Sequence, residues 1–153
     1  MGQKYFVSIC IPSYDRPHTL YRLLKTIDVQ NAGEVEVVIC EDFSSKRNGI
    51  REQVENFKKE TEYAVVYKEN EENLGYDKNL KELIRNASGK WIVFMGDDDV
   101  FAAGALDKFI PFLKQHNELG YVLRAHDTIH KNGQIEKFRY YAGEKFFEPG
   151  AET

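Results

Sequence analysis

Three consecutive carboxylates, Asp97, Asp98 and Asp99, directly follow the apolar run WIVFM at residues 91–95. Adjacent anions repel one another, so the fold is expected to supply a cation that balances them. Oxygen ligands without histidine or cysteine suit a hard ion such as Mg²⁺ or Mn²⁺. Mg²⁺ typically takes only one or two protein carboxylates, because water and substrate phosphates complete its coordination. The triplet is therefore a candidate site for a divalent metal bound together with a diphosphate.

A second interpretation of the triplet is structural. Aspartate is a good N-cap and is favoured at the positive end of a helix dipole, and a helix is predicted shortly after the triplet, at residues 104–116. One aspartate would suffice for such a cap, and three exceed that need. The residues of the triplet alone leave both interpretations open.

Strand-like and helix-like segments alternate along the chain. Runs of β-branched and aromatic apolar residues predict strands, and apolar residues repeated every three or four positions predict helices. The predicted strands are residues 6–12, 35–40, 63–69, 91–95 and 121–129, and the predicted helices are residues 18–30, 49–60, 73–89 and 104–116. Four strand–helix repeats indicate an α/β fold, with a mostly parallel sheet and helices on both faces. The Asn132-Gly133 pair beyond the fifth strand predicts a hairpin turn.

Polar segments follow each of the first four predicted strands. Ligand sites of parallel α/β sheets lie beyond the carboxyl ends of the strands, so these segments are expected to share one edge and to carry the function. Three of the four are acidic, which again favours a bound cation. The segments are PSYDRP (12–17), EDFSS (41–45), NEENLGYDKN (70–79) and GDDD (96–99).

The composition excludes several classes of protein. A chain of 153 residues fits one domain with a sizeable core, and its net charge of −4 argues against non-specific binding to nucleic acid. The sequence has no apolar run of membrane-spanning length and no signal-peptide pattern at its start. We therefore expect a cytoplasmic protein, for which peripheral attachment at the inner face of the membrane stays open. Cys10 and Cys40 lie in apolar runs and are predicted to be buried, reduced thiols on neighbouring strands.

The four polar segments together resemble glycosyltransferase family 2, the nucleotide-sugar transferases of the GT-A fold. They look most like its bacterial polysaccharide branch, which includes abequosyltransferase-like enzymes. The resemblance is carried by VSICIPSYDRPHTL, VEVVICEDFSS, ENEENLGYDKNL and ASGKWIVFMGDDDVFAAGAL, which come in the family's order and spacing and cover about residues 5–127. It implies a Rossmann-like GT-A fold and an inverting, Mn²⁺- or Mg²⁺-dependent transfer of sugar from a nucleotide-diphosphate donor. The implied acceptor is a saccharide or a lipid-linked saccharide, in cell-surface polysaccharide synthesis.

The resemblance also implies roles for particular residues. Ser13 matches a residue that contacts the nucleotide base, Asp42 matches the acid that hydrogen-bonds the base, and the loop from Asn73 matches the part near the diphosphate and sugar. The implied nucleotide-sugar residues are Pro12, Ser13, Tyr14, Asp15, Asp42, Asn73, Gly75, Lys78, Asn79 and Asp97, and the implied metal residues are Asp98, Asp97 and Asp99.

Each of these segments also has a structural interpretation. Residues 13–15 would form a Pro-flanked turn that caps the next helix, and Asp42 would be an exposed turn residue. Asn73 would cap a helix, and Lys78 would be solvated surface.

The acidic triplet departs from the form common in the family. Many members have an aspartate where this chain has Gly96, followed by x-Asp-Asp, whereas here the acids occupy positions 97–99. This leaves open which carboxylate binds the metal. Asp98 is favoured, then Asp97, while Asp99 could bind sugar hydroxyls or cap the helix.

The catalytic base is the least defined part of the resemblance. Inverting members place a carboxylate base well downstream of the metal motif, so we expect the base to lie beyond Thr153, with Asp127, His126 and His130 as the nearest candidates. Residues 1–153 are accordingly interpreted as one catalytic-domain fragment, with a nucleotide-sugar-binding half at about 5–127 and the start of an acceptor region at 128–153. The aromatic segment 137–150 is expected to continue into the acceptor lobe or to pair copies of the chain as a homo-oligomer.

Two other functions compete with a transferase. The first is a catalytically silent module that binds a nucleotide sugar, which the lack of an evident base supports. The second is a phosphate-transfer fold, which also places acids at the ends of parallel strands. That fold needs a nucleophilic aspartate after the first strand, and Asp15 lies in a Pro-flanked turn of the wrong kind.

Overall fold

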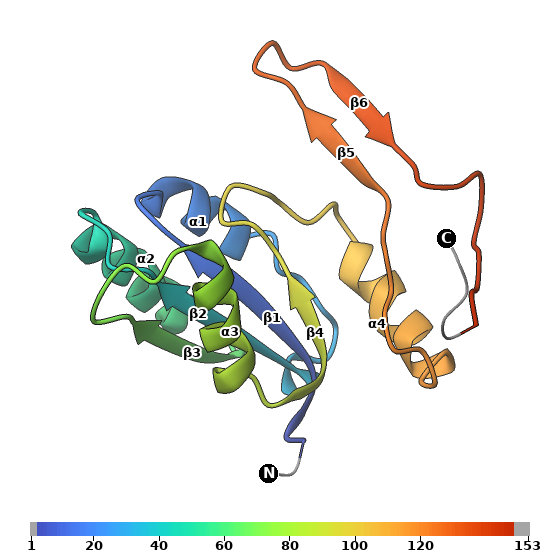
Figure 1. Cartoon of the computed structure of the whole chain (residues 1–153), viewed down its shortest axis with the longest axis horizontal. Helices are drawn as coiled ribbons and strands as arrows, with labels where there is room; N and C mark the ends of the chain where they lie inside the picture. Colours follow the sequence, from blue (N-terminus) through green and yellow to red (C-terminus); the bar gives the residue numbers. More distant parts are fainter. Residues whose placement is uncertain (1–2, 149–153) are drawn as a thin grey trace. The chain divides into compact units, whose positions relative to one another are not determined.

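The computed structural model describes residues 3–148 of the chain (Figure 1). It forms two units, Met1–Gln115 and His116–Thr153, and each is described here by itself. Among the described residues, none of the helices combines the length and the apolar character needed to cross a bilayer.

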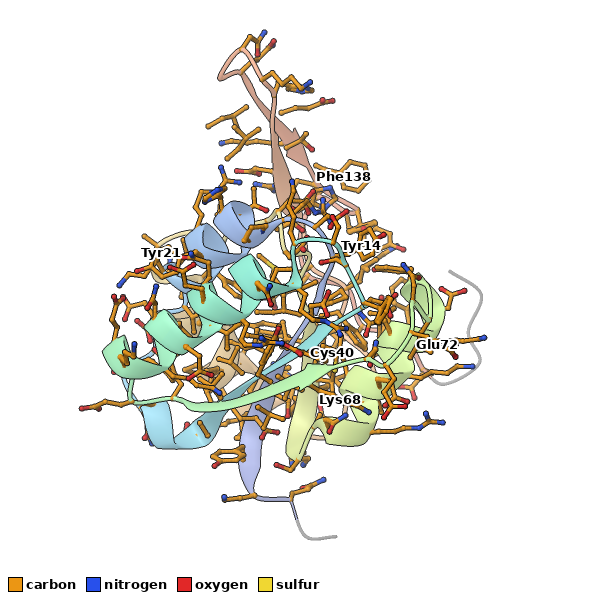
Figure 2. The ribbon with its side chains drawn as sticks, turned by 90° about the vertical axis from the view of Figure 1, so that its left-hand side faces the viewer. Tyr14, Tyr21, Cys40, Lys68, Glu72 and Phe138 are labelled. Carbon is orange, nitrogen blue, oxygen red and sulfur yellow. The ribbon has the colours of Figure 1, made fainter. Side chains whose placement is uncertain are left out.

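The first unit is built around a four-stranded parallel sheet with the order β3-β2-β1-β4. Helices α1 and α2 lie on one side of the sheet and α3 lies on the other (Figures 1 and 2). This arrangement confirms the predicted α/β fold with helices on both faces. The elements are β1 (Tyr5–Ser13), α1 (Pro17–Leu24), the 3₁₀ helix η1 (Ala32–Glu34), β2 (Val35–Glu41), α2 (Arg47–Glu60), β3 (Ala64–Glu69), α3 (Tyr76–Asn86), β4 (Gly89–Phe94) and α4 (Ala105–Gln115).

The two central strands are apolar along most of their length because helices cover both of their faces. Under α3, Leu83 packs on a fully buried cluster of Cys10, Val38 and Cys40, the last of which is labelled in Figure 2. Burial raises the pKa of both thiols to about 12, so they stay protonated at neutral pH. The prediction of two buried, reduced cysteines on neighbouring strands is confirmed.

A buried carboxylate joins the amino ends of three strand segments. Glu36 is only 2% exposed, and its Oε1 accepts hydrogen bonds from Ser8 Oγ and from the Ser88 N–H, both at 2.5 Å. Ser8 Oγ in turn accepts the Gly89 N–H at 2.8 Å. A Cβ at Gly89 would stand 2.5 Å from the backbone nitrogen of Ser8, so only glycine allows β4 to approach β1 this closely.

Helices α1 and α3 are shorter than predicted, since α3 occupies only Tyr76–Asn86 of the predicted residues 73–89. Helix α1 was predicted over residues 18–30 but ends at Leu24. The Thr26 hydroxyl donates to the carbonyl of Leu23 at 2.7 Å, and such a bond competes with continuation of the helix. Helix α4, by contrast, runs through Pro111 without interruption.

The second unit contains a β-hairpin of β5 (His126–Ile129) and β6 (Ile135–Phe138). The predicted strand over residues 121–129 is confirmed only in its second half, since β5 begins at His126, and it pairs antiparallel with β6 in a separate sheet. The predicted turn at Asn132-Gly133 is confirmed, since the Gly133 N–H donates to the carbonyl of His130 at 2.9 Å. A tight turn closes the hairpin locally and gives β5 its partner within a few residues.

The three candidate bases all have partners inside this hairpin unit. Asp127 is ion-paired with Arg139 at 2.8 Å, and His130 Nε2 lies 3.1 Å from a carboxylate oxygen of Glu136. The His126 ring stacks on Phe138, with ring centroids 4.8 Å apart. Large exposed aromatic side chains continue along the segment, and homo-oligomer formation through them stays a prediction. They are Phe138, Tyr140, Tyr141, Phe146 and Phe147.

The packing of α3 gives a test of the sheet core. Leu83 is fully buried, whereas its neighbour Ile84 is 48% exposed. We expect Leu83→Ala to lower the free energy of unfolding by about 2–5 kcal/mol, since it leaves a cavity under α3. Ile84→Ala, the matched control, should change it by less than about 1 kcal/mol. Urea denaturation measures both, and equal losses would contradict the placement of α3.

Candidate functional site

The hydrogen-bond ladder of the sheet continues past the strand ends and brings the polar segments together. Because all four strands are parallel, their carboxyl ends meet at one edge, as predicted. We call this edge the rim, defined by residues 12–17, 41–45, 70–79 and 96–99. The joining bonds run from Asp42 N–H to Ser13 O (3.0 Å), from Asn70 N–H to Glu41 O (2.9 Å) and from Met95 N–H to Cys10 O (3.0 Å).

A cavity of about 490 Å³ opens at the rim and is lined by residues from all four segments, of which 41–45 contributes Asp42 alone. Of the residues implied by the resemblance, all line the cavity except Asp15 and Lys78. Three further lining residues were not predicted, namely Arg16, Tyr76 and Gly96.

Asp97 is the buried member of the acidic triplet. Its side chain is 0% exposed, and its Oδ2 accepts the Tyr14 N–H at 3.2 Å. Burial raises the pKa of Asp97, because the charged form loses hydration, while the Tyr14 N–H and the Arg16 guanidinium oppose this rise. Arg16 Nη2 lies 2.6 Å from Oδ1, an ion-pair distance without hydrogen-bond geometry, so this oxygen has no hydrogen-bond partner. The hydroxyl of Ser13, 1% exposed, lies close enough to Asp97 to lower the pKa of that carboxyl, and it has no other hydrogen-bond partner.

Asp98 and Asp99 converge above Gly96. A Cβ at Gly96 would stand 2.9 Å from Asp99 Oδ2 and 3.1 Å from Asp98 Oδ1. Two carboxylate oxygens therefore face the space that a side chain at position 96 would fill. An aspartate at position 96 would place its own Cβ in that space.

The helix-cap interpretation of the triplet is wrong. Helix α4 begins at Ala105, well beyond Asp99. The triplet instead forms a tight turn, in which the Asp99 N–H donates to the carbonyl of Gly96 at 3.1 Å.

The carboxylate oxygens of the triplet could supply part of the coordination of a hard divalent ion, but they do not form a complete protein site for one. No group of three or more His, Cys, Asp or Glu side chains in residues 3–148 has the geometry to hold a metal. Mg²⁺ and Mn²⁺ do not require one where a diphosphate supplies further oxygens. The two carboxylate oxygens that face the space above Gly96 are thus compatible with such an ion.

Asp42 lies inside the rim and is not an exposed turn residue. It is 5% exposed, and its Oδ1 accepts the Leu74 N–H and Asn70 Nδ2, at 2.9 and 2.8 Å. Its Oδ2 accepts the Gly75 N–H at 2.9 Å. The carboxylate therefore fixes the loop that enters α3, where Gly75 adopts a φ of 76° that favours glycine. One further lone pair of Oδ2 is left for a ligand.

Asp15 joins two rim segments instead of lining the cavity. Its Oδ1 accepts Ser45 Oγ at 3.0 Å and the Lys46 N–H at 3.2 Å, directly before α2. The structural interpretation of this turn is thus partly correct, although the helix that Asp15 supports is α2 and not α1. Lys78 is exposed on α3, in agreement with its interpretation as solvated surface.

Arg16 is the functional candidate that the sequence reasoning missed. Its guanidinium contacts Asp97 and, through Nη1, Asp98 Oδ2 at 2.5 Å. The available signal was its position in PSYDRP, a segment predicted to share an edge with three acids. Tyr76, the first residue of α3, was also missed and leaves its ring 69% exposed at the cavity.

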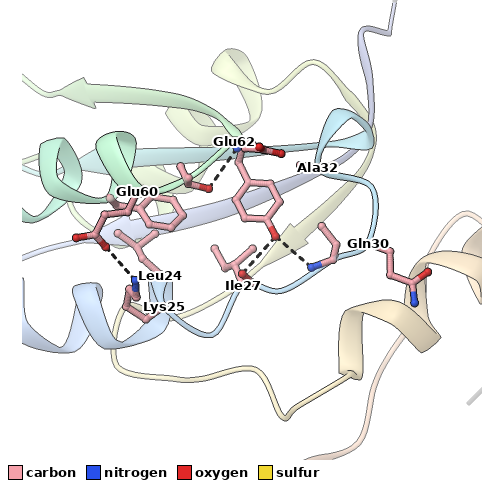
Figure 3. A pocket seen from close by; sticks show the side chains of 11 residues that line it. Leu24, Lys25, Ile27, Gln30, Ala32, Glu60 and Glu62 are labelled. Carbon is pink, nitrogen blue, oxygen red and sulfur yellow. Dashed lines mark hydrogen bonds and ion pairs between the residues drawn. The ribbon is translucent and has the colours of Figure 1, made fainter.

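A second hollow lies at the opposite edge of the sheet, among the segments that precede β2 and β3 (Figure 3). It measures about 310 Å³, and several of its polar groups are paired with one another. Lys25 bonds Glu60 at 2.9 Å, and Tyr63 OH bonds the Val29 N–H at 3.1 Å. Within the described part of the chain, the buried polar atoms without partners include two at the rim cavity and none here. The rim cavity is therefore the candidate site.

The hydrogen bonds of Asp42 generate a prediction. Asp42→Asn should lower the free energy of unfolding by about 1–3 kcal/mol, because an amide cannot accept all three bonds of the buried carboxylate. The Leu74 and Gly75 amides should exchange faster with deuterium. Asp77→Asn, an exposed change in the same helix entry, is the control. Unaltered exchange at both amides would show that Asp42 does not hold the loop.

The comparisons with known proteins agree with this geometry. Residues 8–150 match the family described as Glycosyl transferase family 2. Abequosyltransferase RfbV of Salmonella typhimurium (strain LT2) is 29% identical over 100 residues, which are 65% of this chain and 30% of that protein. The UDP-Glc:alpha-D-GlcNAc-diphosphoundecaprenol beta-1,3-glucosyltransferase WfgD of Escherichia coli is 27% identical over 134 residues, 88% of this chain and 51% of that protein. The chain thus spans about half, or less, of the length of these relatives.

Solved structures share the fold. TarS residues 1–349 from S. aureus superimposes with a TM-score of 0.66 at 22% identity, over 73% of this chain and 33% of that one. The mannosyltransferase PcManGT from Pyrobaculum calidifontis, in complex with GDP-Man and Mn²⁺, gives a TM-score of 0.64 at 21% identity, over 73% and 34%. These likenesses establish the GT-A fold of the first unit. With a family match that extends over residues 8–150, the chain belongs to glycosyl transferase family 2.

Proposed function

We propose that the rim cavity binds a nucleotide-diphosphate sugar together with Mn²⁺ or Mg²⁺. The observation that carries this proposal is the approach of Asp98 Oδ1 and Asp99 Oδ2 to the space above Gly96, at a cavity that Ser13 and Asp97 also line. On this geometry, Asp98 and Asp99 hold the cation, and Asp97 lies beneath them. A divalent cation there supplies Lewis-acid stabilisation of the charge on the departing diphosphate.

Other residues of the rim would bind the nucleotide part of the donor. Tyr14 is 45% exposed at the cavity, and its ring is a surface on which a nucleobase can stack. Ser13 lines the cavity beside it. Asp42 holds the loop of Asn73 and Gly75 in place, and its remaining lone pair is available to the base. Binding in this cradle fixes the donor so that its anomeric carbon is oriented for attack.

For the whole protein, we propose transfer of the bound sugar to a saccharide or lipid-linked saccharide in cell-surface polysaccharide synthesis. The names of the relatives support this, because WfgD acts on a diphosphoundecaprenol-linked sugar and RfbV is an abequosyltransferase. A lipid-linked acceptor would bring the protein to the membrane surface from the cytoplasmic side. A catalytically silent binding module is less favoured, since its named relatives are transferases.

The metal-dependent site is tested by thermal unfolding with UDP or GDP. At a nucleotide concentration of about 100 times Kd, binding should stabilise the native state by about 2.7 kcal/mol, and this gain should require Mn²⁺ or Mg²⁺ and disappear in EDTA. Gly96→Ala should remove most of the metal-dependent part, because its Cβ displaces two carboxylates. Gly120→Ala, where a Cβ would meet nothing within 4 Å, is the control. Equal stabilisation with metal and with EDTA would refute the metal site.

Transferase activity is tested on the protein encoded by the whole gene. UDP-, GDP-, TDP- and CDP-sugars are offered with a diphosphoundecaprenol-linked saccharide, and mass spectrometry follows the acceptor. We expect a product larger by one sugar with one of these donors, and little or none from the 153-residue chain alone. Donor binding without transfer by the whole protein would favour the silent module instead.

A further inference from the structure

The Arg16 guanidinium bridges two members of the acidic triplet. It lies 2.6 Å from Asp97 Oδ1 and 2.5 Å from Asp98 Oδ2, across more than eighty positions of the sequence. Among the described residues that line the rim cavity, it is the only lysine or arginine. One guanidinium thus contacts two of the three carboxylates and supplies part of the balancing charge that the sequence led us to expect from a metal ion. The Arg22 guanidinium also reaches the triplet, where its Nη2 donates to the backbone carbonyl of Asp98 at 3.0 Å.

The backbone around Arg16 holds it in this position. Asp15 has a φ of 58°, a left-handed conformation that is costly for a residue other than glycine, and its carboxylate is anchored to the segment before α2. Pro17 begins α1 and disfavours a helical conformation at Arg16. The chain therefore turns sharply at Asp15 and directs Arg16 back over the acids. The Arg16 side chain is half exposed, at 49%, so its end can move without disturbing the core.

Asp98 divides its two oxygens between different surroundings. Its Oδ2 contacts Arg16, whereas its Oδ1 faces the space above Gly96 where Asp99 also converges. A divalent cation in that space and the Arg16 guanidinium would share one carboxylate. Because two cations on one carboxylate repel each other, occupation by one weakens the hold of the other.

We propose that Arg16 is a resident counter-cation, which occupies the acidic triplet in the empty site and moves to the donor diphosphate when metal and nucleotide enter together. This inference rests on the proposed function. A guanidinium matches phosphate oxygens with a planar, two-pronged set of donors, so the diphosphate offers it a partner as good as the carboxylates it leaves. Arg16 therefore opposes metal binding in the absence of nucleotide and favours it in the presence of nucleotide. The coupling is reciprocal between the two ligands.

The test measures metal binding and nucleotide binding separately, without activity. Free Mn²⁺ is followed by electron paramagnetic resonance, first with no nucleotide and then with UDP or GDP. In Arg16→Gln, the Mn²⁺ affinity without nucleotide should rise about two- to fivefold, the range of an exposed ion pair. The affinity for the nucleoside diphosphate at saturating Mn²⁺ should fall about tenfold or more, since charge-assisted hydrogen bonds are lost. The affinity for the nucleoside, which has no phosphate, should stay unchanged.

Two variants serve as controls. Lys25→Gln removes the same charge at a similarly exposed side chain in the hollow of Figure 3, and it should change neither affinity. Arg16→Lys keeps the charge but loses the planar fork, so it should restore the weak binding of Mn²⁺ alone and recover only part of the nucleotide affinity. This variant also keeps the test valid if Arg16→Gln does not fold.

The outcomes separate this inference from the proposed function. A wild-type chain that binds neither Mn²⁺ nor nucleotide refutes the proposed function, and the inference with it. If the wild-type chain binds both and Arg16→Gln binds Mn²⁺ alone with unchanged or weaker affinity, Arg16 does not compete with the metal. In that case the inference is overturned while the site stands.

Discussion

The parallel hydrogen-bond ladder that flanks β1 is the constraint on which the rim depends. It continues for one residue past the strand ends, where the carbonyl of Ser13 accepts the Asp42 N–H and the carbonyl of Cys10 accepts the Met95 N–H. A slip of one residue in either pairing would turn every side chain of that strand to the opposite face. In the observed register, Asp42 reaches the loop before α3, and Asp97 reaches the backbone of Tyr14. The site is thus fixed mainly by backbone geometry.

Two buried carboxylates lie at opposite ends of the sheet, and their partners show that burial alone does not identify a functional acid. Glu36 and Asp97 are both almost inaccessible to solvent. Glu36 accepts hydrogen bonds from the Ser8 hydroxyl and from the hydroxyl and amide of Ser88. These bonds hold the strands together. Asp97 keeps one oxygen without a hydrogen bond at the wall of a cavity. That oxygen is held by an ion pair with the half-exposed side chain of Arg16, at 2.6 Å, and a buried acid with such a replaceable partner is typical of a site shaped for a ligand.

The sequence predicts the strands of the first unit well, because buried parallel strands are apolar along their whole length and polar segments must follow them. It therefore also locates the rim and most residues that line the cavity. It does not predict where α1 ends, since that depends on one hydroxyl of Thr26 competing for a carbonyl. The apolar run at residues 121–129 could not reveal its pairing, because a strand's partner is set by turns and contacts outside the strand.

Arg16 and Asp42 illustrate a different limit of sequence reasoning. The contact of Arg16 with Asp98 joins positions more than eighty residues apart, and only the folded register brings them together. Asp42 was identified from the resemblance as a base-binding acid, while its bonds to Leu74 and Gly75 depend on a loop conformation that no periodicity encodes. Residue types at the rim are thus visible in the sequence, but the division of roles among them is a property of the fold.

Gly89, at the amino end of β4, lies against the backbone of Ser8, and this contact affects the position of the acids that follow the carboxyl end of the strand. A side chain there would meet the backbone of Ser8 and force β4 away from β1. A strand advances roughly 3.3 Å per residue, so Gly96 lies roughly 20 Å along the chain from that contact. Because the pairing of β4 with β1 runs from Gly89 to Phe94, it would carry such a displacement along the strand toward the turn of Asp97 and Asp98. A substitution at position 89 would therefore alter the rim, although residue 89 itself contacts no bound ligand.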